Sequence, residues 1–155
     1  MKRLFLTAAL LGLSSLSSAD TPAEFCASDW PGDAEMRTYC ENNQRQAMRE
    51  FETLSGTIAA TCGSEWLPDY EMALYCYRNQ SAADQRLKMD AGDEVSEYCF
   101  NEWSGDHEMV EYCINNQRGA RDRLADRYTA GDIAACEREW GIDYEMVEYC
   151  IEGGY

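Results

Sequence analysis

A cysteine-bearing repeat constrains this chain more than any other feature of its sequence. The pattern C-x3-W-x2-D-x-E-M-x2-Y-C-x2-N-Q starts at four cysteines that are 36, 37 and 37 residues apart. These first cysteines are Cys26, Cys62, Cys99 and Cys136. Recurrence at such a period is typical of proteins built from stacked structural repeats. The fourth copy is expected to be a truncated terminal repeat, because it has no Asn-Gln pair and five residues follow its second cysteine.

Each repeat is expected to contain a short helix, a tight corner and a long helix. In the short segment of the third repeat, Val95, Cys99 and Trp103 are four residues apart, which places them on one helical stripe. The long segment is amphipathic with the same helical period. Its apolar stripe runs through Met109, Cys113, Asn116, Ala120 and Leu124. The predicted fold is therefore an all-α array of four helix–corner–helix repeats.

The corner carries glycine or proline and an aspartate at the same place in every repeat. These aspartates are Asp33, Asp69, Asp106 and Asp143. An aspartate oxygen accepts hydrogen bonds from free N–H groups at a helix start, so each is expected to cap a long helix. The alternative is a calcium site built on the D-x-E spacing. Two carboxylates supply too few ligands for that ion, which takes six to eight oxygens.

All eight cysteines lie in the repeats, two per repeat and 14 residues apart. In an exported chain an even cysteine count predicts a disulfide framework. Within a repeat the two cysteines lie on adjacent antiparallel helices, about 6 and about 10 Å from the corner at ~1.5 Å per residue. Between repeats, the long helix after Cys76 is much longer than the short helical segment that runs back before Cys99. The Cα atoms of Cys76 and Cys99 would therefore lie farther apart than the ~7 Å limit for a bridge. The expected bridges, each a staple within one repeat, are Cys26–Cys40, Cys62–Cys76, Cys99–Cys113 and Cys136–Cys150.

Two aromatic positions recur in every repeat. The tryptophan four residues after the first cysteine is expected to pack over the disulfide. These residues are Trp30, Trp66, Trp103 and Trp140. The tyrosine before the second cysteine points away from the bridge and is expected to contact the neighbouring repeat. A surface ladder that binds glycans or peptides is the alternative, because aromatic side chains are also favoured in binding sites. These residues are Tyr39, Tyr75, Tyr112 and Tyr149.

An Asn-Gln pair follows the second cysteine in three repeats, where the apolar stripe continues. The pairs are Asn43-Gln44, Asn79-Gln80 and Asn116-Gln117. We expect these amides to bond free carbonyl groups at the end of a short helix. The alternative is a row of amides that lines a groove.

The first residues have the features of a secretory signal. Lys2 and Arg3 precede a ten-residue apolar run, and Ser17 and Ala19 provide small residues before a cleavage site. The run is too short to cross a bilayer, which takes about 20 residues. We therefore expect a signal peptide over 1–19 and one α-helical repeat domain over 20–155, exported to the periplasm or the extracellular space. Its repeats are expected near 26–55, 62–91, 99–130 and 136–155.

The chain is strongly acidic, with a formal net charge of −16. Removal of Lys2 and Arg3 leaves 11 basic against 29 acidic residues, a net charge of −18. This charge disfavours nucleic acids and anionic membranes as partners and permits a cationic protein or peptide. The alternative is that the charge only keeps the protein soluble.

The sequence shows no set of residues expected of an enzyme, a metal site or a cofactor site. His107 is the single histidine, and the cysteines are assigned to bridges rather than to a nucleophile. C-x2-C pairs, G-x-S-x-G elbows and phosphate-binding loops are absent from the sequence. We therefore predict a protein that is not an enzyme and that uses no metal or cofactor.

The motif W-x2-D-x-x-M-x2-Y-C, followed by Asn-Gln in three copies, resembles short segments of exported bacterial proteins of unknown function. This resemblance implies a disulfide-bonded helical module and carries no activity with it. The E-M before a cysteine and the cysteine pair are also similar to a family of exported bacterial lysozyme inhibitors, although the spacing differs. The predicted function is an exported non-enzymatic binding or interaction module. The alternatives are an acidic inhibitor of a cationic hydrolase such as lysozyme and a purely structural envelope protein.

Non-reducing peptide mapping tests the predicted pairing. Cleavage of the oxidised protein between its repeats should release four bridged species, each joining the two cysteines of one repeat. A bridge between Cys40 and Cys62 would contradict the assignment. A far-ultraviolet circular dichroism spectrum dominated by strand signal would contradict the all-α fold.

Overall fold

The computed structural model describes residues 21–90 and 92–153, and the predicted signal peptide over 1–19 lies outside the described residues. The described residues form eight helices and no strands. In chain order these are α1 (Pro22–Asp29), α2 (Ala34–Phe51), α3 (Thr57–Trp66), α4 (Tyr70–Met89), α5 (Glu94–Glu102), α6 (His107–Arg127), α7 (Ala130–Trp140) and α8 (Tyr144–Ile151). The predicted all-α array of four helix–corner–helix units is confirmed.

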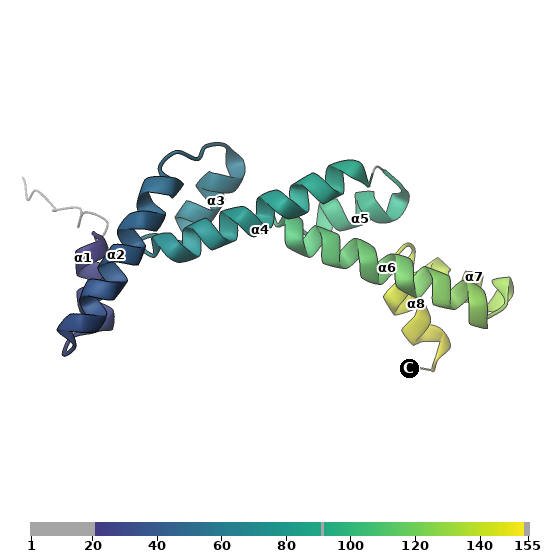
Figure 1. Ribbon diagram of the computed structural model, residues 1–155. Coiled ribbons are helices and arrows are strands. Elements are labelled where there is room, and N and C mark those ends of the chain that lie inside the picture. Colours follow the sequence, from purple (N-terminus) through teal and green to yellow (C-terminus); the bar gives the residue numbers. More distant parts are fainter. Residues whose placement is uncertain (1–20, 91, 154–155) are drawn as a thin grey trace, which may run out of the picture.

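The helices are arranged as a chain of pairs. Each short helix packs against the long helix that follows it, and each of α2, α4 and α6 packs against the long helix of the next repeat. The α1–α2 and α7–α8 pairs lie at opposite ends of the array (Figure 1). Neighbouring repeats therefore meet mainly through the even-numbered helices.

One disulfide joins the two helices of each repeat. The bridges are Cys26–Cys40, Cys62–Cys76, Cys99–Cys113 and Cys136–Cys150, the four pairs expected from the sequence. Their Cα atoms are 5.7 to 6.0 Å apart, inside the normal range for a bridge. Closing a loop of about 15 residues removes roughly 3 kcal/mol of entropy from the unfolded chain in the loop-closure model. Each bridge thus stabilises a unit that has little core of its own.

The corner is a turn that ends in a helix cap. The backbone N–H of Asp106 donates to the carbonyl of Trp103 at 3.0 Å, and the other three repeats have the equivalent bond. The Asp106 carboxylate then accepts from the N–H of Met109 at 3.1 Å. Because a turn bond joins residues three apart, the W-x2-D spacing follows from this geometry. The predicted capping role is confirmed for all four aspartates.

The apolar core consists of two clusters that bridge repeats. One cluster joins the first two repeats and includes Phe51 and Leu74. The other runs from Leu87 of α4 to Val147 of α8. The predicted apolar stripe of the long helix is not buried along its whole length. Leu124 is buried, whereas Met109 is half-buried. Both clusters therefore contain buried residues from more than one repeat.

The first repeat differs from the others where its long helix would meet a preceding repeat. Val110 and Ile114 of α6 are 1% exposed and face the neighbouring repeat's core. The first repeat has Arg37 and Glu41 at these two positions. Charged side chains are tolerated there because the described residues place no repeat before α2.

Replacement of Leu124 by alanine tests the importance of the junction core. Leu124 is 1% exposed, so Leu124→Ala should lower the free energy of unfolding by about 2–5 kcal/mol in urea titrations. Met89→Ala is the control, because Met89 is 80% exposed and its loss should cost about 0.5 kcal/mol or less. Equal effects of the two substitutions would contradict the assigned core.

Candidate binding grooves at the repeat junctions

A glutamine from each of the first three repeats caps the long helix of the next repeat. Nε2 of Gln117 donates to Oδ1 of Asp143 at 3.0 Å, and its Oε1 accepts from the N–H of Tyr144 at 2.6 Å. Gln44 and Gln80 make the equivalent pairs of bonds. We call this arrangement the amide clamp.

The amide clamp corrects the expected role of the Asn-Gln pairs. The glutamine oxygen accepts from free N–H groups at a long-helix start, whereas the sequence suggested free carbonyls at a short-helix end. A helix start presents unpaired donors, and the aspartate cap satisfies only some of them. Gln44 and Gln117 are nearly fully buried. The asparagines of the pairs, Asn43, Asn79 and Asn116, stay half-buried.

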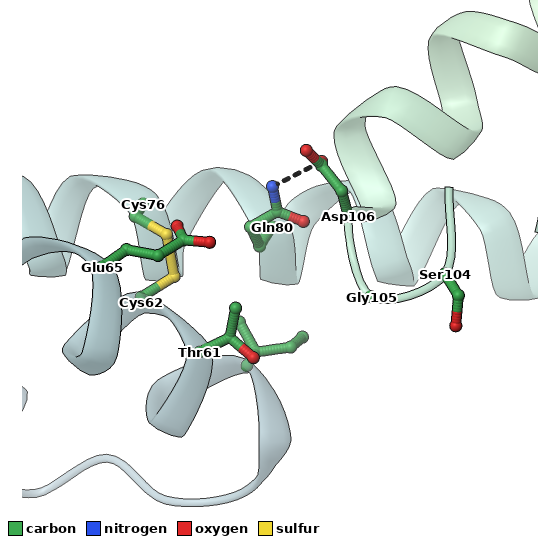
Figure 2. Close-up of a pocket in the computed structure, with 9 residues that line it drawn as sticks. Thr61, Cys62, Glu65, Cys76, Gln80, Ser104, Gly105 and Asp106 are labelled. Atoms are coloured by element: carbon green, nitrogen blue, oxygen red, sulfur yellow. Dashed lines mark hydrogen bonds between the residues drawn. A yellow bond between two sulfur atoms is a disulfide. The ribbon is translucent and has the colours of Figure 1, made fainter. Parts of the chain in front are cut away.

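The amide clamp forms part of a groove between the second and third repeats. This groove has a volume of about 240 Å³, and Figure 2 shows Gln80 reaching across it to Asp106. The Cys62–Cys76 bridge and Glu65 lie on the side of the second repeat. Of the described residues that line this groove, none is aromatic.

The equivalent groove between the third and fourth repeats has a different lining. It has a volume of about 270 Å³. Its aromatic and thioether side chains are Tyr98, Trp103, Tyr112, Met109 and Met146. Its carboxylates are Glu102, Asp143 and Glu145, and the described residues that line it include no basic side chain. We call this the aromatic groove.

The electrostatics of the aromatic groove are seen at Tyr98. Its hydroxyl donates to Oδ2 of Asp143 at 3.3 Å. Burial, followed by the nearby carboxylates of Asp143, Glu102 and Glu145, raises the pKa of Tyr98 to about 12. A phenolate would be both desolvated and repelled at this place, so the groove is a region of negative potential.

The structure places the recurrent aromatic residues largely at the surface. Trp30, Trp66 and Trp103 are 40 to 43% exposed at the ends of their short helices, and Trp140 packs against the core. Their expected packing over the disulfides stays a prediction. The tyrosines are 52 to 63% exposed, in keeping with the surface alternative rather than with burial against the next repeat.

Sequence reasoning missed the acidic residues of the aromatic groove. A sequence pattern could have indicated some of them, because an acidic residue precedes the tryptophan in all four repeats. These residues are Asp29, Glu65, Glu102 and Glu139. Nothing in the sequence indicated that Glu102 and Glu145, from different repeats, would line the same groove.

The single histidine is held by contacts with the second repeat. His107 Nδ1 lies 3.8 Å from Oδ1 of Asp84, and its backbone N–H belongs to an amide clamp. Within the described ranges, no group of three or more histidine, cysteine, aspartate or glutamate side chains could hold a metal ion. No described helix combines the length and the apolar character needed to cross a bilayer.

Comparisons with protein-family models, with curated proteins and with solved structures gave no match to this chain. The candidate grooves and the exposed aromatic residues are therefore the basis for a functional proposal.

Replacement of Gln117 by leucine tests the amide clamp. Gln117→Leu leaves the Asp143 carboxylate and the Tyr144 N–H without the amide, which should cost about 1–3 kcal/mol of unfolding free energy. Hydrogen exchange at the Tyr144 amide should accelerate in the same variant. Gln85→Leu is the control, because Gln85 is an exposed glutamine of α4. A Tyr144 exchange rate unchanged by Gln117→Leu would show that the clamp is not formed.

Proposed function

We propose that this protein is an exported, non-enzymatic binding module whose partner is a cationic protein or peptide. The observation that carries the proposal is the recurrence of an exposed tyrosine in every repeat of a strongly acidic chain. Tyr39, Tyr75 and Tyr112 are each at least 61% exposed. Large aromatic side chains are more often buried, and at interfaces they provide rigid contact area.

Export is supported by the chemistry of the cysteines. Four disulfides account for all eight cysteines, and such bridges persist in oxidising compartments. The basic and apolar start of the sequence has the composition of a secretory signal.

The charge supports a cationic partner. Several arginines are already paired with carboxylates of the neighbouring repeat, as in Arg86–Glu111 and Arg123–Glu148. With a net charge of −16, most carboxylates still have no positive counterpart in the chain. Complementary charge speeds encounter with a basic partner and selects against acidic ones.

Titration with two basic proteins of unrelated fold, one of them a hen-type lysozyme, tests the proposal. Binding measured by calorimetry should be strongest at low salt and weaken as the screening length falls to about 8 Å at 0.15 M. Binding to lysozyme that survives at this salt would favour an inhibitor-like role. Absence of binding to either protein at low salt would overturn the proposal and favour a purely structural role.

A double substitution tests the part played by the tyrosines. Tyr39→Ser with Tyr75→Ser should weaken binding by about tenfold, since truncation of an interface tyrosine often costs more than 1 kcal/mol. Met89→Ser removes a different exposed apolar side chain and should have little effect. Equal affinities of the two variants would show that Tyr39 and Tyr75 do not contribute to the interaction.

A further inference from the structure

The aromatic groove differs from the groove between the second and third repeats in a way that the repeat pattern does not require. Thr61 of the second repeat is replaced by Tyr98 at the equivalent position of the third. Trp103 and Tyr112 line the aromatic groove, whereas their equivalents Trp66 and Tyr75 are not among the residues that line the other one. The two grooves share the amide clamp but not the aromatic walls.

The aromatic groove is open to a ligand. Trp103 is 43% exposed and Tyr112 is 61% exposed. Glu102 and Glu145 are also exposed, so their carboxylates are free to reorient toward a bound group. A volume of about 270 Å³ exceeds what a single amino-acid side chain needs.

The lining selects for a planar cation. The faces of aromatic rings attract positive charge, and tryptophan does so most strongly. A guanidinium group stacks on such faces and also pairs with carboxylates through two parallel hydrogen bonds. Thioether side chains such as Met109 and Met146 are polarisable and adapt to a flat group.

We infer that the aromatic groove between the third and fourth repeats binds an arginine side chain of a basic polypeptide. Trp103 and Tyr112 would provide the stacking faces, and Glu102 and Glu145 the charge partners. This inference rests on the proposed function and deepens it, because it assigns the recognition of one arginine of the cationic partner to one junction of the array.

Short peptides provide the test. The oxidised, exported protein is titrated with acetyl-Gly-Arg-Gly-amide and with the same peptide carrying citrulline, which keeps the shape of arginine without its charge. Nuclear magnetic resonance follows the indole N–H signals of the four tryptophans and the methionine methyl groups. The arginine peptide should shift Trp103 and Met146 most, and the citrulline peptide should shift neither.

Matched variants separate the groove from the general charge. Glu102→Gln with Glu145→Gln should weaken binding of the arginine peptide about tenfold, since each exposed ion pair contributes up to about fivefold. The control, Glu65→Gln with Glu108→Gln, removes the same charges at equivalent positions one repeat earlier and should change affinity less than about twofold. Trp103→Leu should also weaken binding, and Trp66→Leu should not. Helical circular dichroism confirms that each variant is folded.

Three results would overturn the inference. One is that the Glu102→Gln, Glu145→Gln variant and its control weaken binding of the arginine peptide equally. Another is that the arginine and citrulline peptides bind with equal affinity. The third is a lysine peptide that binds as tightly as the arginine peptide, because this would show that the planar guanidinium group is not recognised.

If basic proteins bind but the Glu102→Gln and Glu145→Gln variant binds them normally, the groove assignment fails while the proposed function stands. If basic proteins do not bind at all, the proposed function fails.

Discussion

The amide clamp holds each repeat in register with the next, and the geometry of the array depends on it. A disulfide fixes the two helices within each repeat, but the four bridges do not link one repeat to another. A glutamine carries a donor and an acceptor on one amide, so it satisfies an aspartate and a helix-start N–H together. The clamp of Gln117 lies in a nearly dry environment, where such bonds are strongest and an unpaired group is most costly.

The clamp also explains why the junctions form grooves. It brings the long-helix start of one repeat beside the second cysteine region of the preceding repeat, as Gln80 and Asp106 show in Figure 2. Residues of the corner region then line the groove together with residues from both helices of the preceding repeat. Residues that line these grooves differ between the two junctions, while the clamp glutamine and aspartate are the same. The replacement of Thr61 by Tyr98 at the equivalent position is such a change.

The helical period predicted where the recurrent tyrosines lie on the long helix but not what they contact. The helical period placed the tyrosines about 100° from the bridge, and contact with the neighbouring repeat was the expected outcome. In the structure the buried contact with the preceding repeat is made instead by the other side of the long helix, through Val110 and Ile114. Tyr112 is left at the surface, while other faces of α6 pack against its own short helix α5, against α4 of the preceding repeat and against α8 of the next.

The sequence by itself determined the local structure of this protein. The spacing of the cysteines, the W-x2-D corner and the aspartate caps depend on contacts within a few residues or within one helix pair, and these followed from helical geometry. The tertiary structure decided which side of the long helix faces the next repeat, and hence the partner of Gln117 and the lining of the aromatic groove. These depend on the angle between successive long helices, which is set by the amide clamps together with the packing of side chains from different repeats. That angle leaves no periodic signal in either repeat alone.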